Sequence, residues 1–209
     1  MSSAQTLTSI ILASYDVGEA DRFLVLLTRE KGRLTARARG VRKLGSRLGG
    51  TLLPLHAVTV EIHESSSSRT ITSAVLMASA GEPSFARFLM GTEASELLLS
   101  LLEDEEPVPE IFDNLRQLLT LPFPQPQHLL SFCIRTLSLL GVLAETTNTD
   151  VFEKLSLEEK LFLEHSARGL TQETVNIGNF FTLPKLCKQL IFEHATRPLR
   201  AAGVTAACR

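Results

Sequence analysis

Five short segments of strand-like composition fill the first 80 residues, and they constrain the fold of this chain more than any other feature. Each has seven to nine residues and is rich in β-branched or apolar types, over 6–13, 22–28, 33–39, 55–63 and 70–77. Turn-forming sequences separate them, including Lys31-Gly32 and the glycine-containing run between Gly40 and Gly50. This spacing predicts a small barrel. The edge of a β-sandwich is the alternative, because strand count alone does not close a sheet.

The hydrophobic period changes after Ser84 from that of strands to that of helices. Apolar residues recur at helical spacing to about residue 103, where an acidic and proline-containing run begins. Further helices are predicted over 110–121, 127–143, 156–166 and 183–201. Ser156 with Glu159 forms a capping-box signature, and Thr182 before Pro184 marks another helix start. The sequence therefore predicts an α+β protein, with a β domain over 1–80 and an α-helical domain over 81–209.

Cysteine content and hydropathy indicate a reducing compartment and no membrane segment. The chain has three cysteines, Cys133, Cys187 and Cys208, in no CxxC pair, so neither a disulfide framework nor a metal site is expected. The amino-terminal segment lacks a basic region and reads as a strand rather than a signal peptide. No apolar run approaches the roughly 20 residues of a membrane span. A cytoplasmic protein is expected.

Positive charge is concentrated in one segment of the β domain. Between Arg29 and Arg47 the chain has eight basic residues and one acidic residue, although the whole has 21 basic and 23 acidic residues. Residues 1–80 contain ten basic and six acidic side chains, and residues 81–209 contain eleven and seventeen. A basic first domain joined to an acidic second domain suggests that the first meets a polyanion.

Strict alternation places the arginines of this segment on one face of a strand. Arg33, Arg37 and Arg39 alternate with small or apolar residues, and same-face neighbours lie about 6.5–7 Å apart, close to the spacing of successive phosphates. The following loop adds Arg42, Lys43 and Arg47. These six residues are the predicted nucleic-acid contacts. A solvated face that only keeps the sheet soluble is the alternative.

Aromatic residues for base stacking are scarce in the β domain, where Tyr15 and Phe23 are the only two before Phe85. Binding is therefore expected mainly at phosphates, with little sequence preference. No nucleophile elbow, phosphate loop or zinc-protease helix occurs, and the run 45–50 lacks a Walker lysine. Neither catalysis nor a cofactor is expected.

The run from Ala13 to Leu55 resembles the amino-terminal signature of the bacterial RecO family of DNA repair and recombination mediators. The matching elements are a Gly-Glu-x-Asp turn at 18–21, Thr28 followed by Gly32, the basic sequence at 40–43, and a serine-initiated segment at 46–53. The resemblance implies an OB-fold first domain and a helical second domain. It also implies binding of single- and double-stranded DNA at the nucleoid, annealing of complementary strands, and cooperation with RecR and the single-strand binding protein SSB in loading RecA.

The resemblance also implies a helical-domain site for the SSB tail, a short acidic peptide ending in a hydrophobic residue and a carboxylate. Basic residues of the predicted helices are candidates for it: Arg116, Arg135, Lys185 and Lys188. For Arg135, a surface position or pairing with a carboxylate of the bundle is the alternative. Many relatives carry a four-cysteine zinc site in the helical domain. This chain has no equivalent between Val142 and Phe152, so a zinc-free member is expected.

A second class of function stays open from the sequence. The chain could be a non-enzymatic adaptor whose basic β domain docks an acidic protein or RNA partner. The salt dependence of DNA binding separates this class from a DNA-binding mediator.

Overall fold

The computed structural model describes residues 3–66, 68–77, 84–144, 150–169 and 177–196. The chain forms two compact units, one of residues 1–81 and 102–116, the other of residues 82–101 and 117–209. The second stretch of the first unit differs from the prediction that everything after residue 80 belongs to the helical domain. Its acidic residues bind arginines of the barrel, and these contacts keep it with the first unit.

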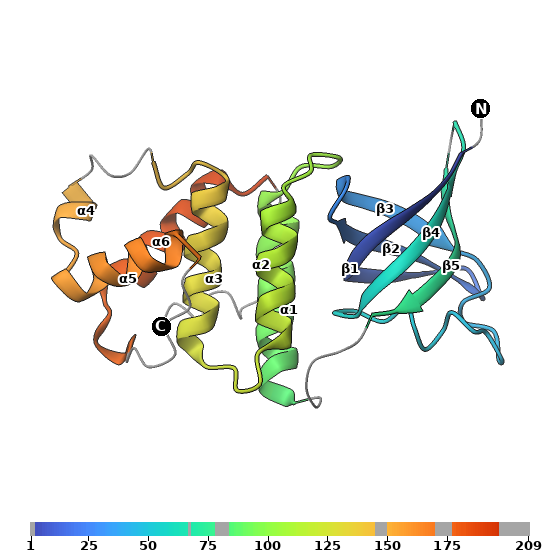
Figure 1. Cartoon of the computed structure of the whole chain (residues 1–209), viewed down its shortest axis with the longest axis horizontal. Coiled ribbons are helices and arrows are strands. Elements are labelled where there is room, and N and C mark those ends of the chain that lie inside the picture. The colour runs from blue at the N-terminus through green and yellow to red at the C-terminus, as the bar shows by residue number, and fades with distance from the viewer. Residues whose placement is uncertain (1–2, 67, 78–83, 145–149, 170–176, 197–209) are drawn as a thin grey trace. The chain divides into compact units, whose positions relative to one another are not determined.

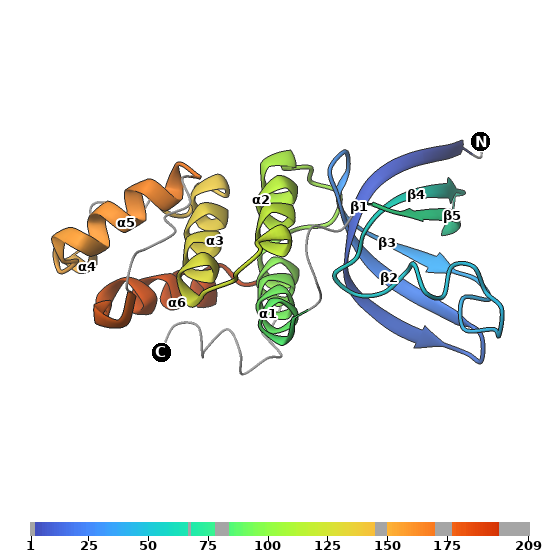
Figure 2. The same ribbon diagram turned by 60° about the horizontal axis from the view of Figure 1, so that its bottom comes forward.

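The first unit contains a closed five-stranded barrel (Figures 1 and 2). Its strands are β1 (Ser3–Val17), β2 (Asp21–Thr28), β3 (Gly32–Ala38), β4 (Ala57–Glu64) and β5 (Arg69–Leu76). They follow each other around the barrel in the order β1-β2-β3-β5-β4, and β4 pairs with β1 to close it. Only β3 and β5 pair in parallel among these strands. This arrangement is the Greek-key barrel of the OB fold, so the predicted fold class is confirmed.

The first strand is longer than the sequence pattern predicts because it serves two neighbours. Its first half, from Ser3 to Ile10, pairs with β4, and residues from Ser9 to Val17 pair with β2. The register shifts between Ile11 and Ala13, which is typical of the bulges that bend a strand around a barrel. The 15 residues of β1 therefore pair with two strands, β2 and β4, and the second pairing closes the barrel.

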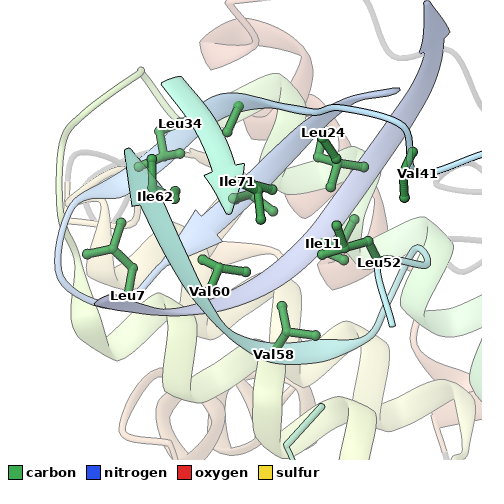
Figure 3. Close-up of a cluster of buried hydrophobic side chains, with 13 residues drawn as sticks. Leu7, Ile11, Leu24, Leu34, Val41, Leu52, Val58, Val60, Ile62 and Ile71 are labelled. Carbon is green, nitrogen blue, oxygen red and sulfur yellow. The ribbon is translucent and has the colours of Figure 1, made fainter. Parts of the chain in front are cut away.

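The barrel core is filled by alternate side chains of all five strands, as Figure 3 shows. On β3 these are Leu34, Ala36 and Ala38, the apolar half of the alternating sequence. Val41 and Leu52, from the segment between β3 and β4, complete the core. The basic segment is therefore anchored by apolar residues on both sides of its exposed part.

The second unit is built around α3 (Pro126–Leu139), which packs against α1 (Phe85–Leu101), α5 (Leu157–Ala167) and α6 (Thr182–His194). The described part of the chain also includes α4 (Asp150–Glu153) and the 3-10 helix η1 (Ile177–Asn179). α2 (Pro109–Thr120) begins in the first unit and ends in the second.

Two helix ends differ from the predicted ones. The helix expected to reach residue 143 ends at Leu139, because Gly141 takes a left-handed conformation (φ 78°) that terminates a helix. The last helix ends at His194 rather than 201, and residues 197–201 lie outside the described part of the chain.

Glu159 joins α5 to α6, and the predicted capping box at Ser156 is present. The Glu159 carboxylate accepts a hydrogen bond from the backbone N–H of Ser156 (3.0 Å). It also accepts hydrogen bonds from the backbone N–H groups of Thr182 and Leu183 (both 2.9 Å) at the start of α6. Burial acts to raise the pKa of Glu159, but these hydrogen bonds outweigh it and lower the pKa below its usual value. One carboxylate thus satisfies the amino ends of two helices.

Candidate nucleic-acid interface

The outer face of β3 carries basic side chains at the predicted positions. Because Leu34, Ala36 and Ala38 point into the core, Thr35 and Arg37 point outward, and Arg39 follows the end of the strand. Thr35 and Arg39 are exposed, and the Arg37 side chain is 40% exposed. Two of the three arginines on this face therefore reach solvent.

Arg33 also points outward but is covered, which corrects the prediction that it lies exposed with the others. Only 3% of its side chain is accessible, and its Nε binds Asp104 Oδ1 at 2.7 Å. The N–H of Glu105 donates to the Arg33 carbonyl at 2.8 Å, so the acidic segment lies directly against this end of β3. The structure therefore does not support Arg33 as a phosphate contact.

Carboxylates pair with five of the eight basic residues between Arg29 and Arg47. The pairs are Arg29 with Asp113, Lys31 with Glu64, Arg33 with Asp104, Arg37 with Asp21, and Arg42 with Asp16. Within the part of the chain that the structure describes, Arg39, Lys43 and Arg47 form no ion pair. The Arg37 and Arg42 side chains are 40% and 33% exposed, so part of each guanidinium still faces solvent.

The turn between β1 and β2 holds the start of the basic loop. Asp21 accepts hydrogen bonds from the Gly40 N–H (2.7 Å) and from Arg37 Nε (2.9 Å). The Arg42 N–H donates to the Ala20 carbonyl, and Arg42 Nη1 donates to the Gly18 carbonyl, both at 2.9 Å. The Gly-Glu-x-Asp turn and the basic sequence that follows Gly40 are therefore parts of one hydrogen-bonded structure.

Three carboxylates of this surface are held ionised by their partners. The Gly40 N–H and then the Arg37 guanidinium lower the pKa of Asp21. Arg22 lowers the pKa of Asp16, and Arg69 followed by Lys31 lowers that of Glu64. The positions of the arginines are therefore maintained at neutral pH.

A groove of about 370 Å³ lies on this face of the barrel, across β2, β3 and β5. Three arginines line it, Arg37 and Arg39 from the β3 side and Arg69 from β5. Phe23 contributes an aromatic ring, and serines of the β4–β5 turn line another part. In OB folds this face and the turn between the fourth and fifth strands bind oligonucleotides and oligosaccharides.

Sequence reasoning missed Arg69 as a member of this site. It is the only basic residue between 48 and 80, so no charge run marks it. The parallel pairing of β3 with β5 places its strand beside Arg37, whose partner across the pair is Thr70. Arg69 also binds Glu64 and Glu105, each at 2.8 Å. A parallel pairing between distant segments leaves no local sequence signal.

The four predicted partner-binding residues do not lie within one unit. Arg116 belongs to the first unit, whereas Arg135, Lys185 and Lys188 belong to the second. Arg135 is half-buried on α3, and its Nη1 donates to the Ala167 carbonyl at the end of α5. Arg135 therefore makes a structural contact within the bundle, as in the alternative prediction. Its partner is a backbone carbonyl and not the predicted carboxylate.

Lys185 and Lys188 lie exposed on α6 between two exposed phenylalanines. Phe181 and Phe192 are 70% and 81% exposed. Phe181 is the N-cap residue just before α6, and Lys185, Lys188 and Phe192 follow at helix spacings of three and four residues, which places these three along one helix face. α6 and its N-cap residue therefore present a stripe of two aromatic and two basic side chains, here called the α6 stripe.

Neither metal ligands nor a membrane-spanning helix is found in the described ranges. No three His, Cys, Asp or Glu side chains there come together as metal ligands. None of the helices there combines the length and apolar character needed to cross a bilayer. Cys133 and Cys187 are buried free thiols, and Cys208 lies outside the described residues.

The closed barrel with this strand order defines an OB-fold protein, and its outer face is basic. Residues 1–80 match the family described as "Recombination protein O N terminal". Over these residues the chain is thus similar to the amino-terminal domain of the RecO proteins. The resemblance seen in the sequence is confirmed.

The curated relatives are named DNA repair protein RecO. The protein of Myxococcus xanthus (strain DK1622) is 38% identical over 115 residues, which are 54% of this chain and 47% of the relative. That of Anaeromyxobacter dehalogenans (strain 2CP-C) is 36% identical over 113 residues, 52% of this chain and 44% of the relative. That of Nocardioides sp. (strain ATCC BAA-499 / JS614) is 33% identical over 141 residues, 64% and 58%. The chain spans about half the length of the curated relatives it matches.

Proposed function

We propose that this chain is a non-enzymatic recombination mediator that acts in DNA repair in the bacterial cytoplasm, at the nucleoid. It binds single- and double-stranded DNA through phosphates with little sequence preference and anneals complementary strands. Together with RecR it helps to load RecA onto DNA coated by SSB. The RecO match of the first domain supports this assignment.

One structural observation carries the proposal. Arg37, Arg39 and Arg69 converge on a groove of the OB-fold face, and Lys43 and Arg47 extend from the adjacent loop without ion pairs among the described residues. Cations from a strand face, a second strand and a loop can follow a nucleic-acid backbone over several phosphates. Binding two strands at once screens their mutual repulsion, which favours annealing.

The α6 stripe supports the proposed SSB contact. An acidic peptide that ends in a hydrophobic residue and a carboxylate needs cations beside an apolar surface. Lys185 and Lys188 supply the charges, and Phe181 and Phe192 supply exposed apolar area next to them. Arg135 is half-buried, and its guanidinium already binds the end of α5.

A titration of labelled single-stranded and duplex DNA with the full chain at increasing salt tests the DNA-binding function. With roughly four to six phosphates neutralised, log K should fall against log salt with a slope of about −3 to −5. Both DNA forms should bind at every base composition. A flat salt response, or binding confined to acidic proteins, would instead favour a protein-docking adaptor.

A further inference from the structure

Two aromatic rings lie side by side on the outside of the barrel. Tyr15 of β1 pairs directly with Phe23 of β2, so the two side chains emerge on the same side of the sheet. Leu24, the next residue on β2, points into the core, which places Phe23 on the outer face. The Cβ atoms of directly opposite residues are about 4.5–5.5 Å apart. Their rings can therefore form one continuous surface.

The pairing continues from the aromatic rings to the arginine face. Phe23 pairs with Arg37 of β3, and Arg37 pairs with Thr70 of β5. A single row across four strands thus runs from tyrosine through phenylalanine to arginine and threonine. Phe23 and Arg37 both line the groove described above, together with Arg39 and Arg69. Apolar ring faces and phosphate-binding cations are neighbours on one surface.

These rings are exposed, although two other residues on the outward side of β2 are buried. Tyr15 is 48% exposed and Phe23 is 42% exposed, whereas Val25 and Leu27, which share the outward side of β2, are 8% and 2% exposed. Tyr15 is the only tyrosine of the chain, and there is no tryptophan. An isolated exposed aromatic is ordinary, but two in register beside a basic groove form a surface that suits a flat ligand.

We propose that Tyr15 and Phe23 form a stacking platform for the bases of single-stranded DNA, with Arg37, Arg39 and Arg69 binding the adjoining phosphates. A base has a π face only when it is unstacked and unpaired, so the platform favours single strands over duplex. It reads no sequence, because every base offers such a face. This inference rests on the proposed DNA-binding function and adds to it the residues that separate single from double strands.

The test compares three probes with the whole chain over a series of salt concentrations. The probes are an oligothymidylate of about 16 nucleotides, a strand of the same length without bases, and a duplex of the same length. Replacing Phe23 by alanine should weaken oligothymidylate binding by about 5- to 150-fold, the range measured for loss of one stacking ring. Binding of the base-free strand and of the duplex should be unchanged, as should the salt slope.

Conservative variants separate stacking from apolar bulk. Phe23→Leu keeps an apolar side chain without a π face and should lose oligothymidylate affinity as Phe23→Ala does, while Phe23→Trp should retain it. Tyr15→Ala should weaken binding and Tyr15→Phe should not. Equal affinity of Phe23→Leu and the parent chain for oligothymidylate would overturn the proposal, even if Phe23→Ala fails to fold.

Tyrosine emission gives a second readout at the ring itself. With one tyrosine and no tryptophan, the emission of the native chain reports on Tyr15 alone. Saturating oligothymidylate should quench it, and the base-free strand should not. Unchanged emission on oligothymidylate binding, or equal loss on all three probes in Phe23→Ala, contradicts a stacking role. If no probe binds in a salt-dependent way, the proposed DNA-binding function itself fails.

Discussion

Replacing Gly32 by alanine should destabilise the first unit more than the same change at Gly18. Both glycines adopt left-handed backbone conformations, with φ of 69° and 59°. A side chain in that region costs about 1–2 kcal/mol at either position. At Gly18 a new Cβ has no neighbour within 4 Å, but at Gly32 it would lie 2.2 Å from the carbonyl oxygen of Glu106.

The overlap at Gly32 is with backbone that cannot easily move away. The segment before Glu106 is held by the Glu105 N–H to the Arg33 carbonyl, by Asp104 to the Arg33 guanidinium, and by Glu105 to Arg69. Overfilling a packed site costs about 1–3 kcal/mol beyond the backbone strain, so Gly32→Ala should lose about 2–5 kcal/mol in total.

Thermal unfolding of the full chain, followed by circular dichroism, measures both variants against the parent. For a chain of this size the extra loss in Gly32→Ala corresponds to a melting temperature about 2–12 °C below that of Gly18→Ala. Equal destabilisation by the two substitutions would refute the tight contact between residues 104–106 and the β2–β3 turn.

Three further outcomes follow from the structure. Because hydrogen bonds hold the pKa of Glu159 below its unfolded value of about 4.3, its contribution to stability is present above that pH and is lost as the pH falls through the lower folded pKa. Glu159→Gln should therefore lower the melting temperature at neutral pH, and the gap to the parent should close below about pH 4; a gap independent of pH refutes this. Changing Lys185 and Lys188 to glutamine should weaken binding of an SSB tail peptide in fluorescence anisotropy and leave DNA binding intact, whereas unchanged peptide affinity would move that site off the α6 stripe. Annealing of complementary strands should need neither ATP nor metal, so a loss of annealing in EDTA would reveal a metal site.

The sequence was most informative where a local period decides the structure. Strict alternation in β3 predicts correctly which side chains enter the core, since successive residues of a strand point to opposite faces. The capping box at Ser156 likewise predicts the start of α5, because the hydrogen bonds involved join residues three apart.

Features that depend on distant segments were not predictable in this way. Alternation cannot reveal that Arg33 is covered, because the covering residue, Asp104, is 71 positions away. The pairing of Tyr15 with Phe23 depends on strand register, which the turn at 18–21 sets and the sequence period alone does not. Arg69 enters the groove through a parallel pairing of β3 with β5. The family resemblance supplied the OB fold, whose strand order no local pattern encodes.

The central claim is that basic side chains of the barrel surface bind DNA phosphates, among them Arg39, Lys43 and Arg47, which form no ion pair within the described residues. Changing Arg39, Lys43 and Arg47 to glutamine removes three exposed charges, and changing Lys154, Lys185 and Lys188 to glutamine removes the same number from exposed positions of the helical unit. The decisive measurement is the slope of log K against log salt for single-stranded DNA with each triple variant. The barrel variant should bind more weakly, with a slope shallower by about 0.7 for each phosphate that the protein no longer neutralises, and the helical variant should match the parent. An unchanged slope in the barrel variant, or an equal change in both, would contradict the account.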